Sequence, residues 1–406
     1  INYLMFRKKC LFCNNKNLND IINLGSHPLA DTFISKSNLH LSDKVYPLIV
    51  QICNDCKNIQ LKCKTTPEER YQENDYSYTS SNSNYSRHYW EKYAEVVLKL
   101  SEKKTNIKIL EIGSNDGYLL KQFKDKGHKV LGIDASPYIA KIAQKNLIDT
   151  EIGIFDENFA NKINNKVGNF DVVIANNVFN HSDNPTSFFK GVKKLLSKDG
   201  FFIFESPYWS NSIISGKFDQ IYHEHVTYVN VRSINKLAER TGLSIYDTYL
   251  SDYHGGSLGI IIKINKNKKN LQKIKFMINQ ENKSKLYSNS FYDNFMKKIN
   301  TRKYIFMEKI YKNLIKQKPL ICIGAAAKAN TFLNFYGLDN KIVNYITDSS
   351  TNKIGKYTPL TRIPIEKDQI IKKFKNPNII FTAWNVSDNL KKIISKINPK
   401  YTELKP

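Results

Sequence analysis

The sequence lacks any long apolar run. No stretch of its 406 residues approaches the roughly 18 to 20 consecutive apolar residues that cross a bilayer. Its first residues, INYLMFRKKC, also lack the apolar core and the small-residue cleavage site of a secretory signal peptide. We therefore expect no membrane partner and a cytoplasmic location.

Acidic residues are also in short supply. The 37 Asp and Glu face 62 Lys and Arg, which leaves a formal net charge of +25. Such a charge would suit a nucleic-acid partner. The excess is mostly lysine, however, and it is spread along the chain beside abundant Asn and Ile. We expect solvated basic surfaces and an anionic substrate such as a sugar diphosphate, with no nucleic acid as partner.

Cysteine is sparse, but four of the six cysteines form two C-x-x-C pairs, Cys10 with Cys13 and Cys53 with Cys56. In a reducing compartment such pairs favour a metal over disulfides. Four thiolates fill the tetrahedral positions of zinc and leave none for water, so the predicted site is structural. Free buried thiols are the alternative. A redox role is disfavoured, because neither pair opens a helix after a strand.

No internal repeat is present, and the chain divides into three blocks. The first is short and irregular and contains both cysteine pairs. In the second, IKILEIG, KVLGIDA, FDVVIANN and GFFIFESP have the apolar character of buried parallel strands, and SIYDTYL and GSLGIIIKI suggest a closing antiparallel hairpin. A polar helical connector then leads to PLICIGAAAKAN, KIVNYITD and PNIIFTAW, which predict a second, smaller α/β unit.

The run ILEIGSNDGYLL is the most informative local signal. A strand leads into Gly113, and a helix begins after Gly117. Glycine allows a sharp turn and close approach of a ligand, and the free N–H groups of the helix can hold a carboxylate. Asp134 ends the next strand, where an acid can hold ribose hydroxyls. A lone glycine turn would also suit NAD.

The pattern E-x-G-x-x-x-G followed by a strand-end Asp resembles class I methyltransferases, and GIFDE and FDVVIANNVFNH match further landmarks of that fold. The resemblance implies S-adenosylmethionine (SAM) as cofactor. The residues expected to bind it are Glu111, Gly113, Asn115, Asp116, Gly117, Asp134, Phe155 and Asn176.

The segment FDQIYHEHVTY gathers Tyr222, His223, Glu224 and His225. Histidines of the zincin motif stand four apart on a helix. Here they stand two apart, which on a strand places both on the same side. Metal binding by this segment and purely structural histidines are both alternatives to catalysis.

The string YHEH-x-x-Y, preceded by ESPYW and followed by YHGGSL, resembles the bacterial sugar C-methyltransferases of deoxysugar pathways. The cysteine pairs, NNVFNH, GAAAKANTFLNF, ITDSSTNKIGKYTP and FTAWN agree with that family, so the resemblance covers nearly the whole chain. It implies a zinc-binding domain at 1–72, a SAM-binding domain at 73–266, and a helical connector with a Rossmann-like domain at 267–406. The expected substrate is a nucleotide-linked keto-sugar, and a monomer is expected.

The resemblance also implies roles for the catalytic residues. A carbon next to a ketone carries a weakly acidic proton, and a histidine titrates near the pH at which a general base works best. His225 is predicted to be this base. Glu224 would orient an imidazole or a sugar hydroxyl, and Tyr222 would bond the substrate or the enolate. His181 would face the substrate, with a helix-capping or core role as its alternative.

Tyr76, Tyr78, His223 and Lys328 are predicted to contact the substrate. A plain surface loop is the alternative for the tyrosines, and a solvated side chain is the alternative for Lys328. Two positions depart from the family: Gly259 follows HGGSL, where Arg is common, and Ala329 stands where glycine is frequent.

Three other functions are alternatives to a sugar C-methyltransferase. An O- or N-methyltransferase would have the same cofactor site, and only the YHEH segment argues against it. A nucleic-acid methyltransferase would need an Asn/Asp-Pro-Pro-aromatic loop or a Pro-Cys nucleophile, and the sequence contains neither. A binding module with a degenerate site is disfavoured by the intact GSNDG and YHEH strings.

Overall fold

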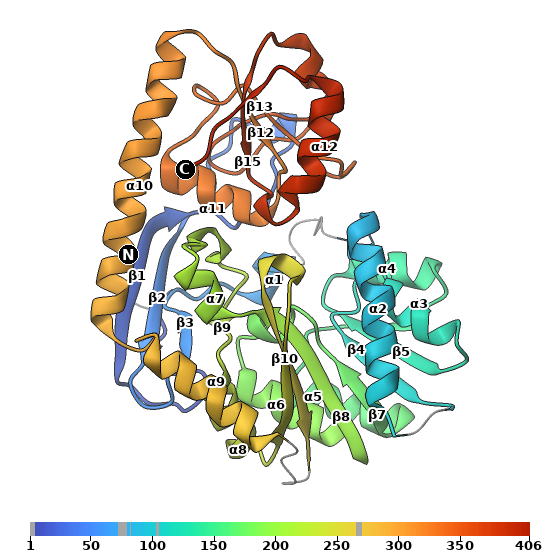
Figure 1. Cartoon of the computed structure of the whole chain (residues 1–406). Coiled ribbons are helices and arrows are strands. Elements are labelled where there is room, and N and C mark those ends of the chain that lie inside the picture. Colours follow the sequence, from blue (N-terminus) through green and yellow to red (C-terminus); the bar gives the residue numbers. More distant parts are fainter. Residues whose placement is uncertain (1–4, 72–78, 82, 103–104, 265–269) are drawn as a thin grey trace. The chain divides into compact units, whose positions relative to one another are not determined.

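The computed structural model describes residues 5–71, 79–81, 83–102, 105–264 and 270–406 (Figure 1). The chain forms two compact units. The first contains residues 1–20, 51–212 and 225–287, and the second contains 21–50, 213–224 and 288–406. The three-domain division remains a prediction. Among the described residues, no helix combines the length and apolar character needed to cross a membrane.

A seven-stranded sheet organises the first unit, in the order β10-β11-β8-β7-β4-β5-β6. The five strands from β4 to β8 pair in parallel, and β11 runs antiparallel to both β8 and β10, which confirms the predicted hairpin. The strands are β4 (Lys108–Ile112), β5 (Lys129–Asp134), β6 (Thr150–Ile152), β7 (Phe170–Ile174), β8 (Leu196–Pro207), β10 (Ser244–Ser251) and β11 (Ser257–Lys263).

Helices cover both faces of this sheet, because alternate side chains of its buried strands point to opposite sides. Ile109 of β4 packs in one apolar cluster with Trp90 of α2, and the next residue, Leu110, packs in the other with Phe188 of α6. Figure 1 shows α2 lying across β4 and β5. The helices are α2 (Asn84–Leu100), α3 (Tyr118–Lys124), α4 (Pro137–Lys145), α5 (Glu157–Val167), α6 (Pro185–Leu195), α7 (Trp209–Ile214) and α8 (Val231–Arg240).

The N-terminal block is more regular than predicted. It forms β1 (Leu18–His27), β2 (Tyr46–Cys53) and β3 (Ile59–Leu61), which join β9 (Thr227–Tyr228) in a sheet of order β1-β2-β3-β9. The prediction of an irregular block was wrong because Asn, Asp and Gly interrupt the apolar pattern of β1. Six of the eight residues of β2 are buried, and this strand pairs with β1 and β3.

The second unit contains the predicted smaller α/β sheet, in which all strands are parallel in the order β14-β13-β12-β15-β16. The strand order reverses between β12 and β15. The strands are β12 (Leu320–Ile323), β13 (Tyr345–Thr347), β14 (Ile365–Glu366), β15 (Asn378–Phe381) and β16 (Thr402–Glu403). The polar connector is helical, as predicted. It contains α9 (Leu271–Lys283), which belongs to the first unit, and α10 (Asn289–Ile315), which belongs to the second. The later helices of the second unit are α11 (Ala327–Tyr336) and α12 (Ser387–Ile397).

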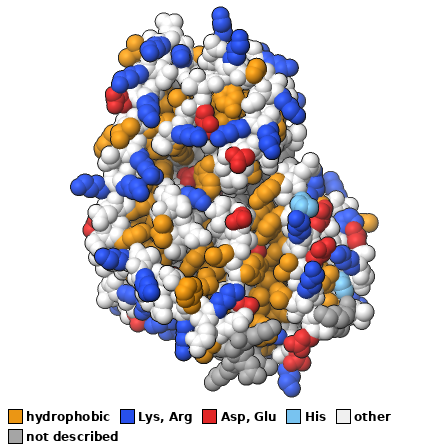
Figure 2. All heavy atoms as spheres, in the orientation of Figure 1, with side chains coloured by type: hydrophobic (Ala, Val, Ile, Leu, Met, Phe, Trp, Pro, Cys, Tyr) orange, Lys and Arg blue, Asp and Glu red, His pale blue; other side chains and the backbone are white. Residues whose placement is uncertain are grey.

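Basic side chains are scattered over the face seen in Figure 2, between acidic, apolar and uncharged groups. They do not gather there into one continuous basic track. This distribution on the visible face matches the even spread of lysine along the sequence.

Candidate functional site

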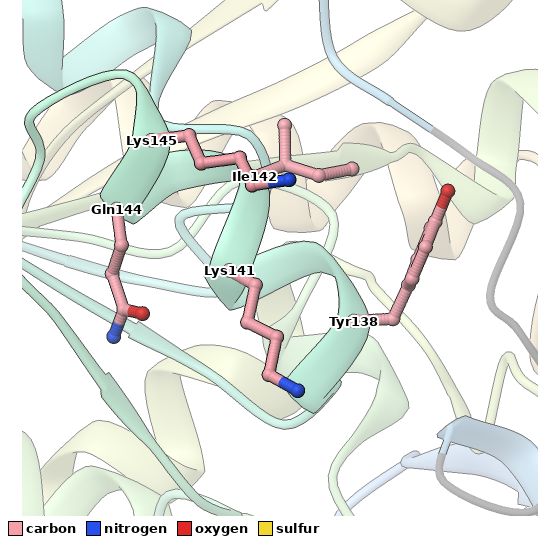
Figure 3. A pocket seen from close by; sticks show the side chains of 5 residues that line it. All are labelled: Tyr138, Lys141, Ile142, Gln144 and Lys145. Atoms are coloured by element: carbon pink, nitrogen blue, oxygen red, sulfur yellow. The ribbon is translucent and has the colours of Figure 1, made fainter.

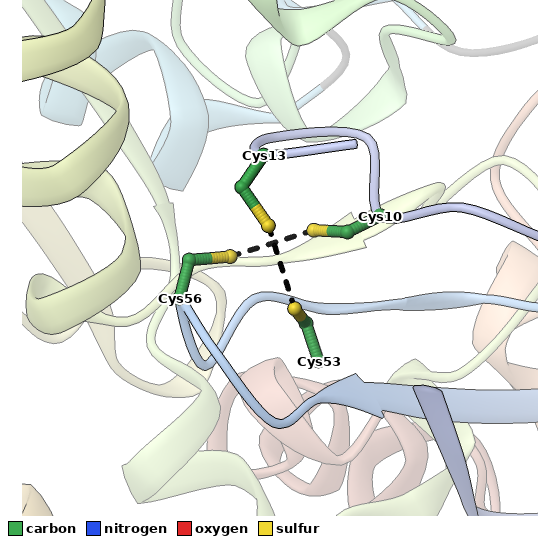
Figure 4. A group of neighbouring side chains, drawn as sticks. All are labelled: Cys10, Cys13, Cys53 and Cys56. Atoms are coloured by element: carbon green, nitrogen blue, oxygen red, sulfur yellow. Dashed lines mark hydrogen bonds between the residues drawn. The ribbon is translucent and has the colours of Figure 1, made fainter. Parts of the chain in front are cut away.

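The four paired cysteines, all in the first unit, converge on one point (Figure 4). The Sγ atoms of Cys10 and Cys56 lie 3.4 Å apart, those of Cys13 and Cys53 lie 3.5 Å apart, and all four lie within 4.8 Å of one another. Tetrahedral zinc with bonds of about 2.3 Å would place its sulfur ligands about 3.8 Å apart. A disulfide needs about 2.0 Å, so the spacing fits a zinc ion and not disulfides.

Two matching turns position these thiols. The residue after each pair, Asn14 or Lys57, has a left-handed backbone with φ of 61°. Its amide donates back to the carbonyl of the first cysteine of its pair, at 2.9 Å to Cys10 and 3.1 Å to Cys53. The Phe12 amide also points to the Cys10 sulfur, at 3.4 Å. The chain therefore supplies both the ligands and the N–H groups that orient a thiolate.

The glycine loop lies between β4 and α3. Gly113 has φ of +70°, and a Cβ added there would come within 2.2 Å of Val178 Cγ2. Gly117 has φ of +77°, and its Cβ would meet Ile148 at 2.9 Å. Both positions therefore require glycine for backbone conformation as well as space. At the start of α3, the Tyr118 amide donates to Asp116 Oδ1 at 3.4 Å, so the loop itself holds the first amide of the helix.

Asp134 lies at the end of β5 beside this loop. Its carboxylate accepts the amides of Asn115 and Ser136, each at 2.9 Å. Burial raises the pKa of the Asp134 carboxyl to about 6, against the opposing effect of these two amides. A carboxylate fixed in this way keeps further lone pairs that could accept ribose hydroxyls.

Asp116 has partners that the sequence did not reveal. Its carboxylate accepts the hydroxyls of Ser80 and Ser81 and, at 3.1 Å, the Ser81 amide. The Ser80 amide donates to the Asn115 side chain at 2.8 Å. The predicted cofactor residue Asp116 therefore holds the segment before α2 against the glycine loop. No motif in the sequence marks these two serines.

The remaining predicted cofactor residues are buried polar or core groups. Glu111 is buried, which raises the pKa of its carboxyl well above the usual value, and its Oε2 has no hydrogen-bond partner within the described chain. The Asn176 Oδ1 accepts the Glu205 amide at 2.8 Å, while its buried Nδ2 has no partner there. Phe155 packs edge-on against Phe188, with ring centroids 4.9 Å apart, so its described contacts are with the core.

Two predicted catalytic histidines lie side by side in the first unit. The rings of His181 and His225 have centroids 5.1 Å apart and are tilted by 48°. His181 ends the 3₁₀ helix η3 (Phe179–His181), and the Val178 side chain just before this helix covers Gly113. Burial, followed by the electrostatic influence of His225 and Arg70, holds the pKa of His181 well below its usual value. The structure thus links the histidine pair to the glycine loop.

An aromatic and ionic cluster holds His181, and the sequence did not reveal it. The Tyr71 hydroxyl lies 2.8 Å from His181 Nδ1, and the two rings are nearly parallel. Asp183 forms ion pairs with the buried guanidinium groups of Arg7, at 2.5 Å, and of Arg70. These contacts join residues far apart in sequence, so spacing could not have predicted them.

His223 and Glu224 lie in a turn, so the alternation of side chains along a strand does not describe this segment. The boundary between the units falls between Glu224 and His225. In the second unit, Glu224 Oε1 accepts the amides of Ala30 and Asp31, at 3.2 and 3.3 Å.

The other two residues of this segment also belong to the second unit. His223 is buried against the Tyr46 ring, and its Nε2 lies 3.4 Å from the Pro47 carbonyl. Burial lowers the pKa of His223 to about 4. Tyr222 is half-buried. Within the described chain, the cysteine cluster is the only group of three or more potential ligands close enough to hold a metal.

Lys328 lies in the first turn of α11, in the second unit. Its Nζ bonds the Asn385 amide oxygen and lies 4.3 Å from the centre of the Trp384 ring. The Trp384 indole donates to Asp219 at 2.5 Å. Burial lowers the pKa of the Lys328 ammonium to about 8, although the Asp219 carboxylate opposes this shift. Lys328 is therefore not a solvated surface lysine.

Tyr76 and Tyr78 lie outside the described residues. A shallow hollow is lined by Tyr138, Lys141, Ile142, Gln144 and Lys145, all from α4 (Figure 3). None of these five residues belongs to the predicted site.

Known proteins resemble this chain along nearly all of its length. Family models match in sequence order: "Putative zinc binding domain" at residues 10–71, "Methyltransferase domain" at 85–248, and "C-methyltransferase C-terminal domain" at 252–403. The C-methyltransferase NovU of Streptomyces niveus is 24% identical over 383 residues, which cover 94% of this chain and 91% of that protein.

Solved methyltransferase structures also resemble part of the chain. The CcbJ methyltransferase from Streptomyces caelestis has 14% identity and a TM-score of 0.34, covering 43% of this chain and 88% of its own. Magnesium protoporphyrin IX methyltransferase from Synechocystis with bound SAM has 14% identity and a TM-score of 0.33, covering 43% and 78%. At these scores neither structure contributes to the assignment.

The three domain matches and the aligned C-methyltransferase point to the same activity. The glycine loop and the four-cysteine cluster are consistent with that activity and with bound zinc. The chain is a SAM-dependent methyltransferase with a zinc-binding domain, and it is similar along nearly its whole length to a C-methyltransferase.

Proposed function

We propose that this methyltransferase places a methyl group on the carbon next to the ketone of a nucleotide-linked sugar, with His225 as the base. The observation that carries the proposal is the buried pair of His181 and His225, with ring centroids 5.1 Å apart in the unit that contains the glycine loop. Methylation of a hydroxyl or an amine has less need for a base matched to a C–H acid.

The chemistry of the pair follows from its surroundings. His225 removes the proton next to the ketone, and the electrons of the broken C–H bond form the enolate. SAM, when bound, would supply the electrophilic methyl group for the new carbon–carbon bond, with S-adenosylhomocysteine as the leaving group. A base of this kind typically contributes roughly 10²- to 10⁴-fold in rate. Because the depressed pKa of His181 keeps that ring neutral, it adds no full charge to oppose protonation of His225.

The link between η3 and the glycine loop supports this assignment. Val178 covers Gly113, and His181 follows three residues later in the same short segment. Holding the reacting carbon and the methyl group about 3 to 3.5 Å apart, in line, supplies a large part of the rate. A rigid connection between the cofactor loop and the histidine pair serves this requirement.

The predicted substrate contacts are part of the same proposal. Lys328 is a half-buried cation whose depressed pKa an anionic phosphate would raise. Tyr222 and Glu224 keep their proposed roles toward the sugar. The contacts of His223 with Tyr46 and Pro47 favour its structural alternative.

The test uses SAM with a ¹³C-labelled methyl group and a panel of nucleotide-linked keto-sugars. We expect NMR of the product to show the label bonded to carbon. With S-adenosylhomocysteine in deuterated water, the enzyme should also exchange the proton beside the ketone, and His225→Ala should abolish both reactions while retaining SAM binding. A label bonded to oxygen or nitrogen would refute the proposal, as would His225→Ala protein with substantial turnover.

A further inference from the structure

In the described part of the chain, the side chain that hydrogen-bonds to the His181 ring is that of Tyr71. Its hydroxyl lies 2.8 Å from Nδ1, and the two ring planes differ by 6° with centroids 6.2 Å apart. The other ring nitrogen, Nε2, is buried and has no hydrogen-bond partner within the described part of the chain. One nitrogen of His181 is therefore fixed by the protein, and the other is left for a ligand.

The contact bears on the tautomer of His181. The Tyr71 O–H can donate to a bare Nδ1, because a phenol is both a donor and an acceptor. In that arrangement, the single proton of the neutral ring resides on Nε2. Burial, together with nearby His225 and Arg70, holds the pKa of His181 well below its usual value, which favours the neutral ring.

The short helix that carries Tyr71 is fixed at both ends. Helix α1 (Pro67–Tyr71) begins with a capping box, in which the Thr66 amide donates to Glu69 at 2.9 Å and the Glu69 amide donates to the Thr66 hydroxyl at 3.2 Å. At its other end, Arg70 forms an ion pair with Asp183, two residues after His181. Tyr71 and His181 are thus held together by contacts beside both residues.

We propose that Tyr71 is a positioning residue, whose hydroxyl holds His181 in the tautomer that presents Nε2–H to the oxygen of the reacting carbonyl. This inference rests on the proposed function, because the oxygen becomes negative only when the neighbouring carbon loses its proton. As that charge develops, the hydrogen bond strengthens and no proton moves to or from His181. A neutral imidazole suits this role, because its N–H stabilises the charge without protonating the enolate.

The first test needs no substrate. Protein labelled with ¹⁵N histidine, with His181 assigned from the spectrum of His181→Gln, should show a neutral ring with its proton on Nε2 between pH 6 and 9. Tyr71→Phe should produce a mixture of both tautomers, while Tyr304→Phe, which removes an exposed hydroxyl on α10, should leave the spectrum unchanged. A proton on Nδ1, or a charged ring at pH 7, in the unaltered protein would overturn the proposal.

The second test is a double-mutant cycle on methyl transfer. Tyr71→Phe should lower kcat by roughly 10- to 100-fold, less than the loss expected for removal of an oxyanion donor, with KM values within about twofold. In a His181→Gln background, whose amide still supplies an N–H, the same change should cost less than about twofold. An equal loss in both backgrounds would refute coupling through His181. Absence of keto-sugar turnover would defeat the proposed function, and the tautomer spectrum would then decide this inference alone.

Discussion

Two glycine loops, one in each unit, use the same backbone arrangement with different surroundings. Gly113 follows β4 and Gly324 follows β12, with φ of +70° and +98°. Each glycine amide donates to a carbonyl near the end of the neighbouring strand, at 2.7 Å to Ile133 and 2.8 Å to Thr347. The first turn of a parallel βαβ unit is therefore built in the same way in both sheets.

The two loops also resemble each other in the acidic residue at the end of the next strand. Asp134 follows the first loop in sequence, and Asp348 follows the second. Each accepts the amide of a loop residue at 2.9 Å and the amide of the serine two residues after itself, also at 2.9 Å. An acid at the end of the second strand thus holds the loop together and is not by itself a cofactor signal.

The loops differ in what lies beyond these shared contacts. The first has a second glycine, Gly117, and the serine contacts of Asp116. The second passes directly into α11, and the Lys353 ammonium donates to the Ala325 carbonyl at 2.9 Å, so part of the loop is occupied by its own chain. The difference predicts that only the first loop binds SAM.

The largest expected effect comes from the zinc site, which among the described residues lies in the first unit alone. Cys53→Ser should remove zinc and abolish SAM binding, because structural zinc contributes about 10 to 16 kcal/mol in small zinc domains, comparable to a whole folding free energy. Cys322→Ala, in β12 of the second unit, should keep one zinc per chain and cost only about 1 to 2 kcal/mol. Metal analysis measures the zinc content of the two variants, and circular dichroism measures their folding. A folded, SAM-binding Cys53→Ser protein without zinc would contradict it.

The two glycines provide the next comparison. Gly113→Ala should weaken SAM binding by roughly 100-fold, because relieving the clash with Val178 displaces the loop by about an ångström. Gly324→Ala meets Ala383 at 2.4 Å and should be similarly destabilising, yet it should leave the SAM Kd within about twofold. Calorimetric titration measures both. A comparable loss of SAM affinity in Gly324→Ala would remove the distinction between the loops.

The strand-end acids should differ in function and in pH dependence. Asp134→Asn should weaken SAM binding by roughly 10- to 100-fold, since hydrogen bonds to charged groups contribute about 1.5 to 3 kcal/mol, whereas Asp348→Asn should not change it. In the unaltered protein, SAM affinity should fall as the pH falls through about 6, where Asp134 becomes protonated. Asp134→Asn should abolish that dependence. A flat profile in the unaltered protein would rule out a titrating Asp134 contact.

The same pKa shift has an opposite effect on stability. The folded pKa of Asp134, about 6, exceeds the ordinary value of 3.8, so ionisation costs stability. The contribution of this group to the free energy of unfolding should therefore fall by about 3 kcal/mol as the pH rises from below 4 to above 6. Asp134→Asn should lose that slope, which denaturant titrations at several pH values would detect.

The parts of the fold and of the candidate site that could be predicted are those with a sequence pattern inside one short segment. The parallel strands, the hairpin, the glycine loop and the paired cysteines each have a recognisable composition or spacing, and the structure contains all of them. The contacts of Tyr71 with His181 and of Ser80 with Asp116 join separate segments through ordinary polar residues. A single sequence contains no pattern that pairs such residues.

The conformation of the YHEH segment also depends on distant contacts. Its composition allowed a strand, but His223 packs on Tyr46 while Glu224 accepts the amides of Ala30 and Asp31. Because these adjacent residues satisfy different distant partners, the segment turns, and alternation along a strand could not describe it. Tertiary contacts overrode the local propensity here.

The smallest expected effect concerns the serine contacts that only the first loop has. Ser81→Ala removes one of several donors to Asp116, so SAM binding should weaken by only about two- to fivefold, as expected for one hydrogen bond of about 0.5 to 1 kcal/mol. Ser37→Ala, at an exposed serine of the second unit, serves as the control. If Asp116 acts by holding this segment, Asp116→Ala and Ser81→Ala should be strongly non-additive, because both remove the same contact. Additive losses would show that Asp116 contributes to SAM binding independently of the serine, and the distinction between the loops would then rest on Asp116 itself.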